Sequence, residues 1–374
     1  MAISAAVAAC RRHRDEVVAL CLREGAGWDL LPELGRRLRR LVAYDASFWS
    51  GADPATSLAR TPVFLENLDG VDCHSFWERE FLVEDVNPFR DLARSARPVA
   101  SLRAATDARP ARSARYRELL APFGYADELR AVFRAGRCPW GMASFFRAGD
   151  DPFDDEEVAL VADLAPAIGE AFRRAAVRRP GQATGAAFGP GLMLFDPDGC
   201  LESLNEQATA WLDELRDASI DDEAAPWLPT EILVVVAHAR AIAAGRERGP
   251  ARTRLQTPLG RWLTVEATPL LKPRDTAGRT ALVLQPAAAW EIAPLIAEAH
   301  GLTPREQEVT RLIARGLTTA EVADELFLSI HTVRDHVKQI FQKIGISSRG
   351  ELVARLFCDH YLEPLLDDVR TQRF

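Results

Sequence analysis

Signals for the start of a helix recur at short intervals over Gly301–Phe357, and they constrain the chain more than any other feature. Three segments have the Ser/Thr-x-x-Glu form of a capping box, in which a hydroxyl and a carboxylate bond free N–H groups of a first helical turn. They are Thr303–Glu306, Thr318–Glu321 and Ser348–Glu351. Apolar residues at helical spacing follow each box, and a further helix can start at Ser329. The pattern predicts four short helices with tight turns, a compact all-α unit.

The stretch Leu328–Gly345 predicts a strongly amphipathic helix. Ser329 can accept a bond from a free N–H group at its start, and Gly345 suits a left-handed end. The apolar stripe consists of Val333, Val337, Ile340 and Ile344. At about 100° per residue, the opposite face gathers His331, Arg334, Asp335, Lys338 and Gln342. Taken alone, this face fits an ordinary solvated surface as well as a binding surface.

The charge distribution favours a local binding surface. The chain has 46 Lys and Arg against 54 Asp and Glu, a formal net charge of −8, which excludes nonspecific polyanion binding by the whole molecule. Over Arg305–Arg355 eight basic residues stand against seven acidic ones, but over His331–Lys343 the ratio is three to one. The short connection Phe327–Leu328 and the small Ala323 would hold this basic helix outward. Such a helix can enter the major groove of DNA, which is roughly 12 Å wide.

This unit closely resembles the LuxR-type helix-turn-helix. The resemblance covers nearly all of 302–357 and is carried by LTPREQEV, GLTTAEVA, LSIHTVRDHV and KIGISSRGELV. It implies contacts with bases or phosphates at Thr332, Arg334, Asp335 and Lys338, and with backbone phosphates near Thr318, Thr319 and Arg349. Asp335 would repel a phosphate, so it would either accept a bond from a cytosine amino group or orient Arg334. One recognition helix reads only a few base pairs, so we expect a homodimer on a pseudo-palindromic site in double-stranded DNA.

Length and composition predict a multidomain protein. A chain of 374 residues is too long for one ordinary core, so we expect two or three domains. No apolar run approaches the roughly 18 residues of a membrane span, and the N-terminus does not have the order of a signal peptide. The six cysteines lack a C-x-x-C pair and predict reduced, mostly buried thiols in a cytoplasmic protein. They are Cys10, Cys21, Cys73, Cys138, Cys200 and Cys358.

Residues 1–177 predict a first domain of helices and strands. An N-terminal helix and a helix ending near Val42 precede a strand around Ala46–Trp49, and Arg97–Ala111 is predicted to be a loop. Leu129–Arg134 and Gly141–Arg147 predict two strands joined by a turn. The acidic residues at 154–157 lack the spacing of a calcium loop, so they favour the start of a helix over a metal site.

Three segments of this domain resemble a GAF-type sensor domain of actinobacterial regulators. They are RYRELLAPFGYADELR, RCPWGMASFFR and FDDEEVALVADLAPAIGEA. The resemblance implies an α/β sensor domain. The segment EFLVEDVNPFRDLARSARPV also resembles the acyl-homoserine-lactone-binding domain of quorum-sensing regulators, where an Asp and a Pro have similar places. That second resemblance implies a receptor for an apolar signal.

A second sensor domain is predicted over 189–287, after a linker rich in Gly, Ala and Pro at 178–188. A strand at Leu192–Phe195, a turn at Asp196–Gly199, a returning strand and a helix capped by Asn205 come first. Later residues alternate around a Pro258–Gly260 turn and close with another strand. This order resembles a PAS domain, which implies an α+β fold. The remaining segments are a connector at 288–300 that is helical after Pro294, the DNA-binding domain at 301–360, and a tail at 361–374.

Other candidate sites are weaker. Asp196 and Asp198 fit a hairpin turn better than a metal site, because only two ligands are in view. His238 fits a satisfied core or surface histidine better than a haem ligand. No phosphate-binding loop, nucleophile elbow or zinc spacing is present, so we expect no enzyme and no cofactor. The expected function is a DNA-binding regulator whose front half binds a small-molecule effector or serves as a dimerisation platform filled by its own side chains.

Overall fold

The computed structural model describes residues 2–23, 25, 27–68, 72–149, 151–177, 188–216, 228–270 and 278–358. These residues form two compact units. The first contains both β-sheets, and the second is the helical part of the chain from Pro286 onward, with Leu259–Trp262. The predicted tail at 361–374 and the predicted linker, apart from Phe188, lie outside the described residues.

The first sheet has the strand order β2-β1-β5-β4-β3. Its strands are β1 (Ala46–Ala52), β2 (Ala59–Glu66), β3 (Val99–Ser101), β4 (Tyr125–Ala135) and β5 (Cys138–Ala148). Every neighbouring pair is antiparallel, which is an α+β arrangement, so the predicted α/β class is wrong. The predicted hairpin is confirmed as β4 and β5. The predicted loop at Arg97–Ala111 is wrong, because it contains β3, which is too short to show a period but pairs with β4.

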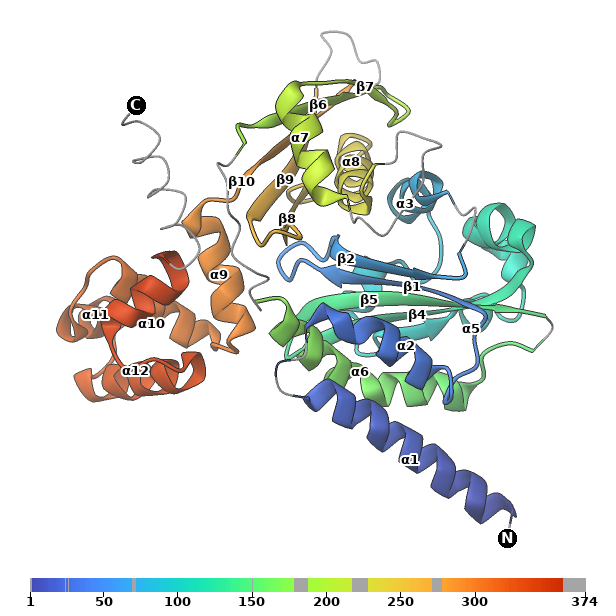
Figure 1. The fold of residues 1–374 in the computed structure, drawn as a ribbon, viewed down its shortest axis with the longest axis horizontal. Coiled ribbons are helices and arrows are strands. Elements are labelled where there is room, and N and C mark those ends of the chain that lie inside the picture. Colours follow the sequence, from blue (N-terminus) through green and yellow to red (C-terminus); the bar gives the residue numbers. More distant parts are fainter. Residues whose placement is uncertain are drawn as a thin grey trace. The chain divides into compact units, whose positions relative to one another are not determined.

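Helices lie on both faces of this sheet (Figure 1). The helices of this part of the unit are α1 (Ala2–Leu22), η1 (Trp28–Leu30), α2 (Leu31–Leu38), α3 (Cys73–Leu82), α4 (Phe89–Arg94), α5 (Leu102–Ala105), η2 (Pro110–Arg112), η3 (Tyr116–Leu120), η4 (Ala121–Phe123) and α6 (Asp155–Ala175). α6 packs on β4 and β5, and a Cβ at Gly169 would lie 2.3 Å from the backbone of Arg134. Asp154 and Glu157 form a capping box at its start, as predicted for a helix end.

The interior between the sheet and α3 holds a buried ionic network. The carboxylate of Glu128 accepts bonds from Arg115 Nε at 2.7 Å, Arg130 Nε at 2.8 Å and Ser144 Oγ at 2.8 Å. Arg130 also donates to Glu80 at 2.6 Å. All five side chains are buried. Although burial alone would raise it, the two neighbouring guanidinium groups lower the pKa of Glu128 to about 2. Paired charges therefore fill this part of the first domain.

The second sheet has the order β7-β6-β10-β9-β8. Its elements are β6 (Gly191–Phe195), β7 (Leu201–Leu204), α7 (Glu206–Leu215), α8 (Thr230–Ala243), β8 (Arg252–Gln256), β9 (Trp262–Pro269) and β10 (Thr280–Pro286). If the strands are numbered from one within each sheet, both sheets have the order 2-1-5-4-3, so the same strand order occurs twice in the first unit. Asp196 Oδ1 accepts from the backbone of Asp198 at 2.9 Å and of Cys200 at 2.8 Å, which is hairpin-turn chemistry. The described residues contain no group of acids, cysteines and histidines suited to a metal ion.

Within the first unit, buried contacts join the part built on the first sheet to the part built on the second sheet. The Arg254 guanidinium donates to the Asp53 carboxylate at 2.9 and 2.7 Å, and Arg60 donates to the Arg254 carbonyl at 3.2 Å. Helix α8 packs against α3 and β2. His238 on α8 is 6% exposed, and its Nδ1 has no partner among the described residues. Of the two positions that the sequence allowed for His238, core and surface, the core is confirmed. The prediction that its ring nitrogens are satisfied is wrong for Nδ1.

The second unit is helical, as the capping signals predict. Its helices are α9 (Ala289–Ala299), α10 (Pro304–Ala314), α11 (Thr319–Glu325), α12 (Ile330–Ile344), α13 (Arg349–Val353) and the single π-helical turn η5 (Ala354–Cys358). The connector helix α9 begins before Pro294, so the predicted start after this residue is wrong. The boxes at Thr303 and Thr318 are reciprocal. The third is not, because the Glu351 carboxylate accepts from the backbone of Ser347 at 2.6 Å.

The cysteines are less buried than predicted. Of those whose side chains are described, only Cys21 is buried, while Cys10 and Cys200 are exposed and Cys73 and Cys138 are intermediate. The Cys358 side chain lies outside the described residues, and so does that of Phe357. Among the described helices, none is both long and apolar enough to cross a membrane.

Candidate nucleic-acid interface

The candidate interface is built on α12, which is capped at both ends. Ser329 Oγ accepts a bond from the backbone N–H of Thr332 at 3.0 Å, and the two hydroxyl oxygens lie 2.8 Å apart. At the other end Gly345 has φ of +74° and donates its N–H to the Phe341 carbonyl at 2.9 Å. In Figure 1, α12 forms one side of the helical unit, opposite α10 and α11.

The two faces of α12 separate as the helical period predicts. Val333, Ile340 and Ile344 are buried against the rest of the unit, and Val337 is half-buried. The predicted readers Arg334, Asp335 and Lys338 are all exposed, and Thr332 is half-buried beside its cap. Neither Arg334 nor Lys338 has an ion pair with a described residue. The helix therefore presents two unpaired cationic side chains to solvent.

Asp335 is paired with a different residue from the one that the sequence suggested. Its carboxylate lies 3.3 Å from His331 Nδ1, one helical turn earlier, and both side chains are well exposed. No hydrogen bond joins Asp335 to Arg334 among the described residues. His331 thus competes with any base for the Asp335 carboxylate.

The three residues predicted to lie near backbone phosphates come together. Thr318 is the N-cap of α11, where its hydroxyl accepts from the Glu321 N–H at 3.3 Å. Arg349, at the start of α13, donates to the Leu317 carbonyl and to Thr319 Oγ1, each at 2.8 Å. Arg349 therefore ties the start of α13 to the start of α11 and holds a positive charge beside the two threonines.

Lys343 does not belong to the exposed basic surface. Its Nζ lies 2.6 Å from Glu306 Oε2 and 3.1 Å from the Gly301 carbonyl. The Glu306 side chain is only 1% exposed, and the same carboxylate closes the capping box with Thr303. The sequence-based ratio of three basic residues to one acidic residue therefore overstates the charge that α12 offers to a ligand.

The turn into α12 contains an unusual residue. Phe327 has φ of +54°, in the left-handed region that L residues other than Asn and Asp rarely adopt, and its side chain is 96% exposed. The N–H of the next residue, Leu328, donates to the Ala323 carbonyl at 2.9 Å, which ends α11 tightly. Sequence reasoning missed this turn conformation because glycine is its usual signal.

Comparison with known proteins identifies this unit. The family described as "Bacterial regulatory proteins, luxR family" matches residues 300–356. The spore germination protein GerE of Bacillus subtilis is 46% identical over 55 residues, which are 15% of this chain and 74% of GerE. The chain belongs to the LuxR family. Its C-terminal domain is the family's helix-turn-helix, as the sequence motifs predicted.

The family model and these sequence relatives match this domain. The transcriptional regulatory protein DesR of Bacillus subtilis is 41% identical over 61 residues, which are 16% of this chain and 31% of DesR. Escherichia coli SdiA aligns over 91% of this chain and 94% of its own, with 13% identity and a TM-score of 0.32. A superposition this loose carries no argument about the front half, for which the GAF-like and PAS-like assignments stay predictions.

Proposed function

We propose that this protein is a cytoplasmic transcriptional regulator, not an enzyme, that binds a pseudo-palindromic operator in double-stranded DNA as a homodimer. The observation that carries the proposal is the exposed face of α12, where Arg334 and Lys338 stand unpaired in a helix fixed by its caps and buried stripe. An arginine that bonds O6 and N7 of guanine contributes about 1–3 kcal/mol of base discrimination. The Arg334 side chain is exposed, as this contact requires.

The other predicted contacts divide between bases and phosphates. Thr332 and Asp335 lie on the same outward part of α12, and Asp335 can accept from a cytosine amino group once His331 releases it. Thr318, Thr319 and Arg349 form a separate polar cluster at the start of α11, suited to a backbone phosphate. Phosphate contacts fix orientation, while base contacts give specificity.

DNA binding is tested with a gel shift on a fragment that wild-type protein selects from random-sequence DNA. We expect Arg334→Ala to weaken binding by roughly 5- to 150-fold and to relax the preference at one base pair. Lys338→Ala should reduce affinity and flatten its salt dependence. Arg311→Ala, which removes an exposed charge from α10, is the matched control. If both α12 variants bind as wild type at moderate salt, the recognition face is assigned wrongly.

The front half, with its GAF-like and PAS-like parts, has two candidate roles. The buried ionic network around Glu128 favours the dimerisation platform over the receptor, because side chains fill that interior and leave no space for a ligand there. A cavity beside α3 and α8 supports the alternative, a quorum-sensing-like receptor for a small apolar signal. Light scattering at several concentrations tests the dimer, and footprints one helical turn apart, roughly 10 bp, test its half-sites.

A further inference from the structure

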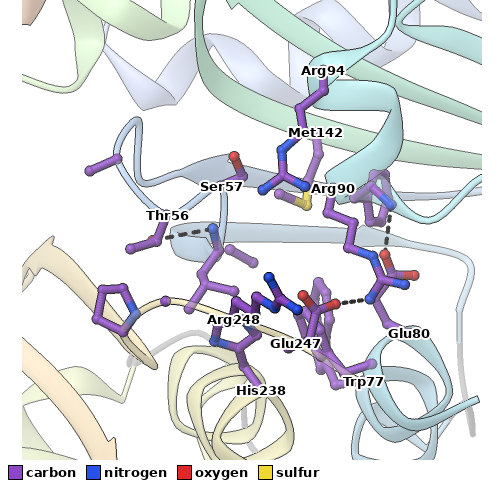
Figure 2. A pocket seen from close by; sticks show the side chains of 17 residues that line it. Thr56, Ser57, Trp77, Glu80, Arg90, Arg94, Met142, His238, Glu247 and Arg248 are labelled. Atoms are coloured by element: carbon purple, nitrogen blue, oxygen red, sulfur yellow. Dashed lines mark hydrogen bonds and ion pairs between the residues drawn. The ribbon is translucent and has the colours of Figure 1, made fainter. Parts of the chain in front are cut away.

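A cavity of about 230 Å³ lies inside the first unit, where elements of its two halves meet. One side consists of the β1–β2 connection, α3, α4 and β5, and the other of α8 and the loop that follows it (Figure 2). The volume lies below the about 300–1,000 Å³ of sites for drug-sized ligands. Any occupant must therefore be small.

The lining carries an excess of positive charge. It includes three arginines and two glutamates, and both glutamates already have partners. Glu80 accepts from Arg130 and from the backbone of Phe89, each at 2.6 Å, and Glu247 pairs with Arg90 across the cavity. The three lining arginines are Arg90, Arg94 and Arg248. Two guanidinium groups, those of Arg94 and Arg248, are thus left without an ion pair to a described residue.

These two arginines approach the cavity from opposite sides. Arg94 extends from α4 and Arg248 from the loop after α8, and Figure 2 shows both side chains reaching toward the space between them. Both side chains are exposed, so water solvates the two guanidinium groups, and an anion at the mouth of the cavity would replace that water between them. A carboxylate suits this place, because arginine bonds it through two parallel N–H groups.

The rest of the lining is mixed, because Thr56 and Ser57 contribute hydroxyl groups beside apolar side chains. Trp77, Phe81 and Met142 contribute apolar surface, and the Phe81 ring lies 5.2 Å from that of His238. His238 is buried, and its Nδ1 has no partner among the described residues. Burial, with a smaller effect of Arg90, lowers the pKa of His238 to about 4, so the ring is neutral near pH 7. A neutral imidazole can donate one hydrogen bond and accept another.

We propose that this cavity binds a small carboxylate with a compact apolar body, of roughly ten non-hydrogen atoms, held by Arg94 and Arg248 at the charged end and His238 deeper inside. The ligand would touch both halves of the unit, so its binding would strengthen their contact. Its effect on DNA binding rests on the proposed function, but the site itself does not. The proposal deepens the receptor role by naming an anionic ligand in place of a purely apolar signal.

Calorimetric titration of the full chain with phenylacetate tests the site, with the neutral phenylacetamide as the matched ligand. We expect saturable binding of phenylacetate with a Kd on the order of 10–100 µM and at least tenfold weaker binding of the amide. Inorganic phosphate should bind weakly, because it has no apolar body. Absence of saturable binding, equal binding of acid and amide, or tighter binding of phosphate would each overturn the proposal.

Variants locate the binding. The double variant Arg94→Gln with Arg248→Gln should lose at least tenfold in phenylacetate affinity. His238→Phe, which keeps an aromatic ring but removes both ring nitrogens, should lose several-fold. Arg109→Gln, an exposed arginine away from the cavity, is the control. Thermal unfolding verifies that each variant is folded. If the folded double variant binds phenylacetate as wild type does, the cavity assignment is wrong.

A gel shift with and without phenylacetate separates this proposal from the proposed function. Carboxylate binding without any DNA binding would support the ligand site and contradict the proposed regulator function. DNA binding that depends on Arg334, in a wild-type protein that does not bind phenylacetate, would support the regulator function and contradict the ligand site. DNA binding that changes with phenylacetate in wild type, but not in the double arginine variant, would support both.

Discussion

Charged side chains have opposite environments in the two units. Around Glu128 the arginines and glutamates are buried and bonded to one another, whereas on α12 Arg334 and Lys338 extend unpaired into solvent. In the first case removing one partner leaves an uncompensated charge in a region of low dielectric. In the second case water already satisfies the charge, so its loss costs little stability. Buried charges therefore specify structure here, and exposed ones are available for recognition.

The largest effect should follow from breaking the Glu128 network. Glu128→Gln leaves Arg115 and Arg130 without their shared carboxylate, and we expect a loss of about 3–5 kcal/mol in the free energy of unfolding by urea. Glu84→Gln, an exposed acid in the same unit, should change it by less than about 0.5 kcal/mol. A loss below 1 kcal/mol for Glu128→Gln, on the order of an exposed pair, would contradict the contrast.

The pH dependence should reflect the same carboxyl group. Its pKa of about 2 in the folded chain lies below the unfolded value of 4.5. The unfolded state therefore binds more protons in this window, and the stability from the network is lost as pH falls from 4.5 through 2. The Glu128→Gln variant should lack this part of the acid destabilisation, which unfolding curves at several pH values measure.

Glu231 on α8 should show the opposite pH dependence, because it is buried and has no ion pair with a residue that the structure describes. Burial raises the pKa of Glu231 to about 7, and its Oε1 has no partner among the described residues. The folded state then binds more protons between pH 4.5 and 7, so stability falls as pH rises through this window. Glu231→Gln should gain on the order of 3 kcal/mol relative to wild type between pH 4 and pH 8. Identical pH profiles for the two proteins would show that this carboxyl group ionises freely.

Two lysines of α12 allow the contrast to be tested on one helix. Lys343→Met removes the partner of the buried Glu306 and should destabilise the helical unit by about 1–3 kcal/mol. Lys338→Met should leave the stability within about 0.5 kcal/mol of wild type but weaken DNA binding. Urea unfolding and the gel shift should thus rank the two variants in opposite orders. The same order in both measurements would mean that Lys343 also faces DNA.

The smallest effect should come from the turn before α12. Phe327→Gly relieves the left-handed conformation and removes no buried contact, so we expect a gain of about 1 kcal/mol in the stability of the helical unit. Phe327→Ala keeps the conformational cost and should be nearly neutral. Thermal unfolding compares the three proteins, and equal gains for Gly and Ala would trace the effect to the exposed ring instead of the backbone.

Local signals predicted the elements whose causes lie within a few residues. The helix start at the acidic residues 154–157, the caps at Ser329 and Asn205, the left-handed Gly345 and the turn at Asp196 were all predicted from sequence and are confirmed. Strands β2 and β3 were missed. Their residues are stabilised by pairing with β1 and β4, and strand pairing of this kind leaves no periodic pattern in a short segment.

The sequence by itself determined the LuxR-type helix-turn-helix and the two faces of α12, because caps and a helical period act within one or two turns. Only the tertiary structure decided that Lys343 turns inward to Glu306 and that Arg349 joins Thr319. It alone also brought His238 of α8 to the cavity lined by α3 and α4. Side chains 30 to 160 positions apart meet through packing, and no local pattern in the chain encodes which of them will do so.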